Sequence, residues 1–163
     1  MLWQSARQEA ARLREVVNPG SRGLENLVAM ANMLGARVWV RPLEPDISGF
    51  VLKEKGTAPE IFINELETPQ RQRFTLAHEI GHLVERNVLA RDDDYSFIDH
   101  RRTDSYDLHE FYADEFAGEL LMPADELDQI VTQHGEYIAA HHFGVSVPAI
   151  NKRRERLAKN PAA

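Results

Sequence analysis

Residues 78–82 read HEIGH, a pattern that can hold a metal ion and a general base on one short stretch of chain. His78 and His82 are four residues apart, so on an α-helix they lie on one face, about one turn apart, where both imidazoles can bind one zinc ion. Glu79 is rotated away from that face by roughly 100°. It can sit beside a metal-bound water, which is the position of a general base. The alternative is a solvated helix that carries these residue types by chance.

A catalytic zinc usually takes three protein ligands and keeps a fourth position open. Residues 107–123 read DLHEFYADEFAGELLMP, which predicts a helix that ends before Pro123. On this helix we predict Glu110 as the third ligand. We predict Asp114, one turn further on, as the carboxylate that accepts the second ring N–H of a ligand histidine, namely His78. The small alanines on the same face would allow a close approach of the two helices.

Two alternatives stand beside this ligand set. His109 is the main rival as third ligand, although it points about 100° away from the face of Glu110 and Asp114. The other alternative is that the acids of this helix lie on the surface, and for Glu115 and Glu119 this is the interpretation we adopt.

The stretch RQRFTLAHEIGH (residues 71–82), followed by HEFYADEFAGELLMP (residues 109–123), resembles the ImmA/IrrE family of zinc metallopeptidases. The spacing of Glu110 and Asp114 also resembles that of gluzincin proteases. The resemblance implies that His78, His82 and Glu110 bind zinc and that Glu79 is the catalytic acid/base. It further implies a helix-turn-helix repressor as the substrate, cut so that repressed genes are released. Some family members carry a further sensory domain at the C-terminus, and we expect none within these 163 residues.

Composition agrees with a small soluble enzyme. The chain has 163 residues, of which 43% are hydrophobic and 28% charged, so one domain (1–163) is expected. It has no cysteine, so zinc must be held by histidine and carboxylate, although manganese or another divalent metal is not excluded. The charged N-terminus contains no apolar signal segment, which predicts a cytoplasmic protein. The formal net charge of −7 argues against bulk nucleic-acid binding and favours a partner with a basic surface.

The expected fold class is α+β. Helical patterns cover residues 2–17 and 21–35, the second capped by Ser21, and together they form an N-terminal helical part (1–35). A zincin-like core (36–123) follows, in which three strands, Arg37–Leu43, Ser48–Lys53 and Glu60–Asn64, are predicted to form a small antiparallel sheet joined by hairpins. A helix opened by Thr68 and Pro69 carries the HEIGH motif to about Arg86. Residues 90–106 are polar and are expected to form a long loop.

Zinc endopeptidases commonly bind substrate as an added strand along a sheet edge, and we expect Pro59–Asn64 to be that edge. An oxyanion also needs a donor beyond the metal. The sequence does not choose among the candidates, which are Tyr106, His109, Tyr112, His100, Arg101 and Arg102. His134, His141 and His142 are expected to be structural.

The C-terminal part (124–159) raises a competing function. A helix, the turn Phe143–Ser146 and a second basic helix resemble a helix-turn-helix, which would make the protein a DNA-binding transcription regulator. We favour the alternative, a helical pair that completes the core or docks a partner, with Ser146 as the N-cap, because this is the one basic cluster in an acidic chain. A third hypothesis is a non-catalytic interaction protein with a structural zinc, but such sites normally have four protein ligands, and the sequence offers three.

Overall fold

The structure is a computed structural model, and it describes the chain outside residues 18–22, 91–94, 101–105 and 162–163, with no description of the side chains of residues 88–100. In chain order the elements are α1 (Leu2–Val16), α2 (Leu24–Met33), β1 (Arg37–Arg41), β2 (Ile47–Lys53), β3 (Glu60–Asn64), α3 (Pro69–Val84), η1 (Glu85–Ala90, a π-helix), β4 (Tyr95–His100), α4 (Leu108–Leu121), α5 (Ala124–His134), α6 (Glu136–Phe143) and α7 (Val147–Lys159). The predicted α+β class is confirmed.

The sheet differs from the prediction in both strand number and direction. Its order is β1-β3-β2-β4, with β1 parallel to β3 and β2 antiparallel to both of its neighbours, so the expected antiparallel three-stranded sheet is wrong. The connection between β1 and β2 is not a hairpin, because β3 lies between them. The fourth strand comes from Tyr95–His100, inside the predicted loop. Its backbone pairs with β2, and ladder hydrogen bonds form whatever the polarity of the side chains.

This strand order also overturns the expected substrate edge. β3 is paired on one side with β1 and on the other with β2, so an added strand cannot pair with Pro59–Asn64. Within the described strands the sheet edges are β1 and β4.

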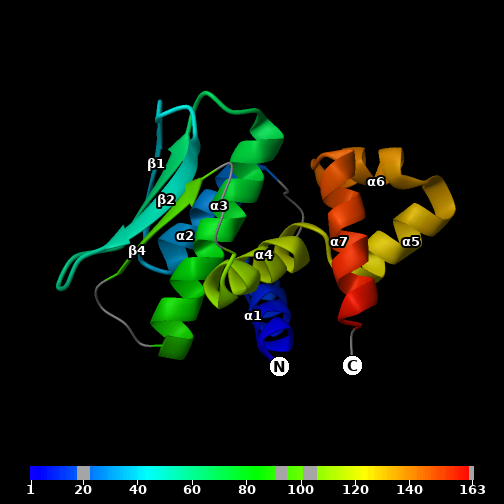
Figure 1. Ribbon diagram of the computed structural model, residues 1–163, viewed down its shortest axis with the longest axis horizontal. Coiled ribbons are helices and arrows are strands. Elements are labelled where there is room, and N and C mark those ends of the chain that lie inside the picture. The colour runs from blue at the N-terminus through cyan, green and yellow to red at the C-terminus, as the bar shows by residue number, and fades with distance from the viewer. Residues whose placement is uncertain (18–22, 91–94, 101–105, 162–163) are drawn as a thin grey trace.

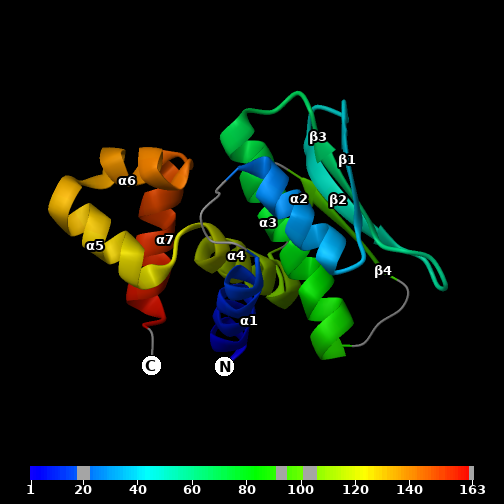
Figure 2. The same cartoon turned by 180° about the vertical axis from the view of Figure 1, so that it is seen from behind.

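One face of the sheet carries the metal-motif helix. α2 and α3 lie against this face, as both ribbon views show (Figures 1 and 2). Ile61 and Ile63 of β3 are fully buried in the same hydrophobic core as Leu76 and Ile80 of α3. Phe62 alternates to the opposite face, as period-two geometry requires, and stacks on Phe50 with ring centroids 4.6 Å apart. The sheet therefore holds α3 in place through buried aliphatic side chains.

The two helices of the candidate site begin at polar caps. Thr68 accepts a hydrogen bond from the Arg71 N–H (3.3 Å), and Pro69 occupies the first turn, as predicted. The π-helix η1 continues α3 beyond Val84. In α2 the N-cap is Gly23, and the expected cap Ser21 lies outside the described residues.

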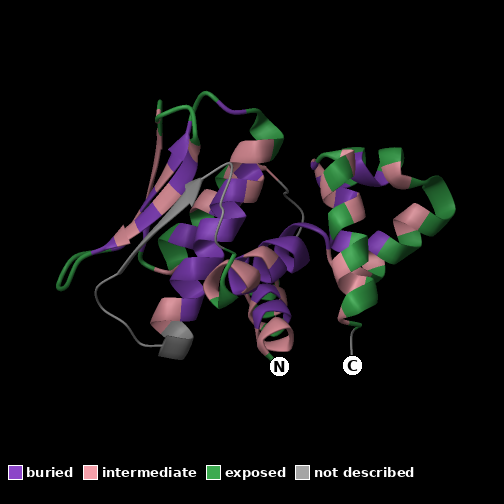
Figure 3. Ribbon diagram, viewed as in Figure 1, coloured by how far each residue is buried: buried purple, intermediate pink, exposed green. Residues whose placement is uncertain are grey.

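The C-terminal helices form a separate layer. α4 packs against both α3 and α1, and α5, α6 and α7 lie beyond α4 on the side away from the sheet (Figures 1 and 2). Figure 3 shows that α3 and α4 are buried over most of their length, whereas α5 to α7 alternate between buried and exposed positions. From α3, the Arg73 guanidinium donates to the carbonyl of Phe143 (2.9 Å) and also to that of Gly144 at the α6–α7 turn. A helix-turn-helix character is not established by this arrangement.

Candidate active site

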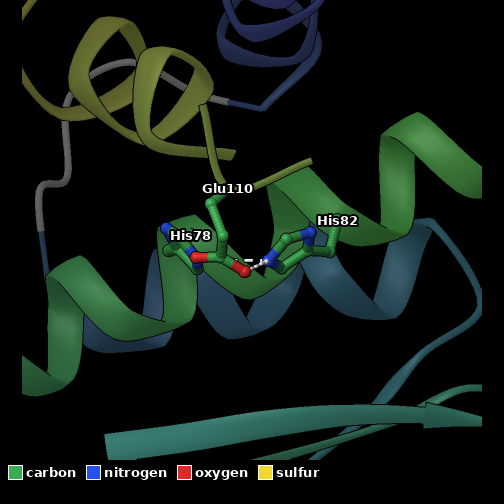
Figure 4. Close-up of side chains that lie close together, drawn as sticks. All are labelled: His78, His82 and Glu110. Carbon is green, nitrogen blue, oxygen red and sulfur yellow. Dashed lines mark hydrogen bonds and ion pairs between the residues drawn. The ribbon is translucent and has the colours of Figure 1, made fainter. Parts of the chain in front are cut away.

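Two imidazoles and one carboxylate converge between α3 and α4 (Figure 4). Glu110 places one carboxylate oxygen 3.2 Å from Nε2 of His78 and the other 3.2 Å from Nε2 of His82. The two Nε2 atoms are 3.1 Å apart. One atom from each of the three residues lies within 4.8 Å of the others, close enough to hold a single metal ion. Both histidines are buried, and the carboxylate is partly exposed.

Local sequence brings the two helices to this distance. Asp107 caps α4 by accepting hydrogen bonds from the N–H groups of His109 (2.9 Å) and Glu110 (3.0 Å), which fixes the start of the helix beside the carboxylate. The glycine of HEIGH, Gly81, lies at the crossing point. A Cβ atom on Gly81 would come within 3.0 Å of the Ala113 Cα, so a larger residue would push α4 away. The glycine of the motif and an alanine of α4 together permit the approach.

Asp114 lies behind the histidine pair and joins it to α7. One carboxylate oxygen lies 3.1 Å from Nδ1 of His78. The other accepts hydrogen bonds from Arg156 (2.7 Å) and from the Tyr106 hydroxyl (3.1 Å), and it lies 3.6 Å from the Lys152 ammonium. A carboxylate in this position fixes the ring orientation and leaves Nε2 of His78 directed at the cluster.

The electrostatics of the cluster favour ionised acids. Burial raises the pKa of Glu110, but hydrogen bonds to both histidines outweigh it and hold that pKa well below its usual range. Burial likewise raises the pKa of Asp114, yet the His78 hydrogen bond and the charges of His78, Lys152 and Arg156 lower it to about 2.

The pKa values of the two histidines are shifted in opposite directions. Burial lowers the pKa of His82 to about 4, so this imidazole is neutral at pH 7, the form that binds a metal. Burial acts in the same direction on the pKa of His78. For His78, however, hydrogen bonds to Asp114 and Glu110 and the charge of Glu79 outweigh the effect of burial, and they raise its pKa well above the usual value. The carboxylates that favour a proton on this ring also favour a cation beside it.

Two further candidates from the sequence are the predicted general base, Glu79, and the rival ligand, His109. Glu79 follows His78 on α3 and is fully buried. His109, the rival ligand, points away from the cluster: its Nδ1 lies 2.9 Å from the Glu85 carboxylate, and Arg86 contacts the same ring.

The oxyanion candidates are only partly placed. Tyr106 contacts Asp114 rather than the cluster itself. Tyr112 is fully buried, and its pKa is raised, chiefly by burial. The side chains of His100, Arg101 and Arg102 lie outside the described residues. Of the structural histidines, His142 lies 2.7 Å from the Glu126 carboxylate.

The interpretation of Glu115 and Glu119 as surface acids is wrong. Glu115 is fully buried and Glu119 nearly so, because helices cover α4 on several sides. Arginines from those helices neutralise them: Arg7 of α1 lies 2.9 Å from Glu115, and Arg153 of α7 forms ion pairs with both acids.

Three of the basic residues of α7 meet acids of α4. Lys152, Arg153 and Arg156 all pair with acids of α4, whereas Arg154 is exposed. Sequence reasoning did not assign Arg156 to the site. Its spacing from Lys152 and Arg153 was a usable signal, since residues three and four apart share a helix face that here meets the acids of α4.

The fold and the donor set together define a metallopeptidase-type site. The chain belongs to the peptidase family described as "IrrE N-terminal-like domain", which it matches over residues 31–155. Among curated proteins it is similar to the radiation response metalloprotease IrrE of Deinococcus deserti, with 40% identity over 78 residues. That alignment covers 46% of this chain and 26% of the relative, so the chain spans about a quarter of that protein.

The fold is also similar to that of a solved structure titled "Mycobacterium tuberculosis transcriptional regulator". The TM-score is 0.62 at 16% identity, and the alignment covers 91% of this chain and 45% of the other. At this identity the likeness concerns the fold alone. Among the described helices, none combines the length and apolar character needed to cross a membrane.

Proposed function

We propose that the protein is a zinc-dependent endopeptidase that hydrolyses a peptide bond in a partner protein in the cytoplasm. The observation that carries this proposal is the convergence of His78, His82 and Glu110 beside a buried glutamate. Membership of a metallopeptidase family supports the class of reaction.

The donor set suits zinc. Two imidazole nitrogens and one carboxylate are typical ligands of catalytic zinc, which leaves a fourth position for water or substrate. His78, His82 and Glu110 would hold the ion, and Asp114 would orient His78. When bound, zinc polarises the scissile carbonyl and lowers the pKa of a water molecule toward neutrality. Another divalent cation, such as manganese, could be held by the same residues.

Glu79 would do the proton transfer. Its carboxylate accepts a proton from the attacking water, whose oxygen bonds to the carbonyl carbon. As the C–N bond breaks, Glu79 delivers that proton to the leaving amine nitrogen. Water is thereby divided between the new carboxyl and amine ends, and Glu79 returns to its ionised form.

The substrate that we propose is a helix-turn-helix repressor, whose cleavage would relieve repression. The metalloprotease name of the Deinococcus relative supports a protein substrate in general, and the family resemblance and the charge support a repressor in particular. A chain of formal net charge −7 attracts a protein with a basic DNA-binding surface.

The alternative function, DNA binding through α7, loses support from the geometry. A recognition helix needs cations directed at phosphates. Arg153 and Arg156 are instead directed at acids of α4, and Lys152 lies 3.6 Å from Asp114 although its side chain stays exposed.

A substitution at the general base tests the proposed function. Glu79→Gln removes the proton acceptor but no metal ligand. We expect zinc content, measured by plasma emission, to equal that of wild type. Cleavage of a mixture of internally quenched peptides should fall by at least about 10³-fold, in the range that loss of an essential group costs. Loss of zinc in Glu79→Gln, or cleavage at the wild-type rate, would refute the assignment.

A further inference from the structure

A pocket of about 310 Å³ lies between α3, α4 and α7 and reaches Asp114, the carboxylate behind His78, although none of the three proposed metal ligands lines it. Phe74 lies on its wall one turn before His78, and the two ring centroids are 6.4 Å apart. Asp114 lines the pocket and contacts the other side of the same imidazole. A side chain in this pocket would therefore belong to a substrate residue a few positions from the scissile bond.

The lining of the pocket is apolar with a cationic side. Its apolar walls include Phe74, Met122, Val145 and Pro148. Four cations and one carboxylate also line it: Arg71, Lys152, Arg153, Arg156 and Asp114. In a chain of formal net charge −7 this excess of positive charge is unusual.

The carboxylate of Asp114 cannot attract a basic ligand, because it is already saturated. His78 occupies one of its oxygens, and Tyr106 and Arg156 donate to the other. Only 10% of the side chain is exposed. Arg153 is equally committed, buried between two acids of α4.

Lys152 is different. Its side chain is 63% exposed, and its one ion pair among the described contacts is the loose 3.6 Å approach to Asp114. Arg71, across the pocket, is 41% exposed but already engaged, since its guanidinium donates to the Ser48 hydroxyl and lies 3.8 Å from the Glu67 carboxylate. A group that enters the pocket therefore meets the exposed ammonium of Lys152, and among the described residues that line the pocket the one carboxylate is that of the largely buried Asp114.

We propose that this pocket is a substrate subsite that binds a peptide carboxylate, with Lys152 as the specificity-determining residue. The carboxylate comes either from an aspartate or glutamate side chain or from the C-terminus of the peptide. The inference rests on the proposed peptidase function and names the chemistry that the enzyme selects.

Cleavage profiling tests the proposal with active zinc enzyme. Mass spectrometry would identify the bonds cut in a randomised peptide mixture with blocked ends. We expect acidic residues to be enriched at one position near the cleaved bond. Replacing glutamate there by glutamine should lower kcat/KM about tenfold, mainly through KM. If the carboxylate is instead that of the C-terminus, free-acid peptides are cut near their end, and their amides are not.

The matched variants are Lys152→Glu and Arg154→Glu, which introduce the same charge change on α7. Lys152→Glu should remove the acidic preference, while the exposed Arg154→Glu, which lies outside the pocket, should keep it. An unchanged profile in Lys152→Glu, or no acidic preference in wild type, overturns the subsite.

A binding measurement separates this inference from the proposed function. In Glu79→Gln, NMR would follow the methyl signals of Met122 and Val145 during titration with acetyl-Ala-Ala-Glu-Ala-Ala-amide, its glutamine counterpart and acetyl-Ala-Ala-Ala with a free C-terminus. We expect at least one carboxylate peptide to shift both signals with a Kd about tenfold below that of the glutamine peptide, and Lys152→Glu to abolish the difference. Equal binding of all three peptides overturns the subsite, even where no cleavage is observed.

Discussion

The metal-site helices and the C-terminal helix α7 both carry clustered charges, but they use them differently. Between α3 and α4, two histidines and Glu110 converge, and no lysine or arginine pairs with that carboxylate among the described contacts, so a metal cation can take the place of a proton in the cluster. On α7, the guanidinium groups of Arg153 and Arg156 are already paired. All of their described ion pairs are with acids of α4. The comparison teaches that a cluster indicates a binding site only when its charges are not already matched inside the protein.

The largest effect is expected at the third ligand. Glu110→Ala removes one of three donors. Zinc should be lost on dialysis against a weak chelator, and peptidase activity should fall to background. His109→Ala is the matched control on the same helix turn, because its ring contacts Glu85 instead of the cluster, and it should keep full zinc content. Zinc retained in Glu110→Ala and lost in His109→Ala would reverse the ligand assignment.

The next largest effect separates stability from metal binding. Arg153→Met leaves Glu119 and Glu115 buried with fewer counter-charges, because the Arg153 side chain is only 2% exposed. The free energy of unfolding should fall by about 3–5 kcal/mol. Exposed Arg154→Met should change it by less than about 0.5 kcal/mol. Urea titrations followed by circular dichroism measure both, and similar values for the two variants would show that α7 is not docked through this network.

A smaller effect is expected where the two regions meet. Asp114→Asn preserves shape but weakens the hydrogen bond that orients His78, so zinc affinity or activity should fall about 10–100-fold. Competition with a chromogenic chelator gives the affinity. Wild-type behaviour of Asp114→Asn would mean that the orientation of His78 is set by packing alone.

The smallest effect is expected at Arg156, and it tests whether this residue of α7 influences activity through its hydrogen bond to Asp114. Arg156→Gln removes the 2.7 Å contact to the outer carboxylate oxygen and should lower activity about three- to tenfold, less than Asp114→Asn. Arg156→Lys should restore part of it, since a cation remains near Asp114. A double variant no worse than Asp114→Asn alone would confirm that Arg156 acts through that carboxylate.

Local pattern determined much of this protein. Spacing placed His78, His82 and Glu110 on two helices, and cap residues such as Thr68 and Asp107 mark where those helices begin. These features depend on residues a few positions apart, because helix periodicity and capping act over one or two turns.

Only the tertiary structure decided how the elements meet. Sheet order depends on pairing between residues far apart in sequence, so β3 became an interior strand and Tyr95–His100 an edge. Burial of Glu115 depends on arginines from α1 and α7, more than thirty-five residues away on either side. Such contacts carry no periodic signal in the chain. The spacing of Arg153 and Arg156 on α7 indicates a shared basic face, but only the structure shows which acids that face meets.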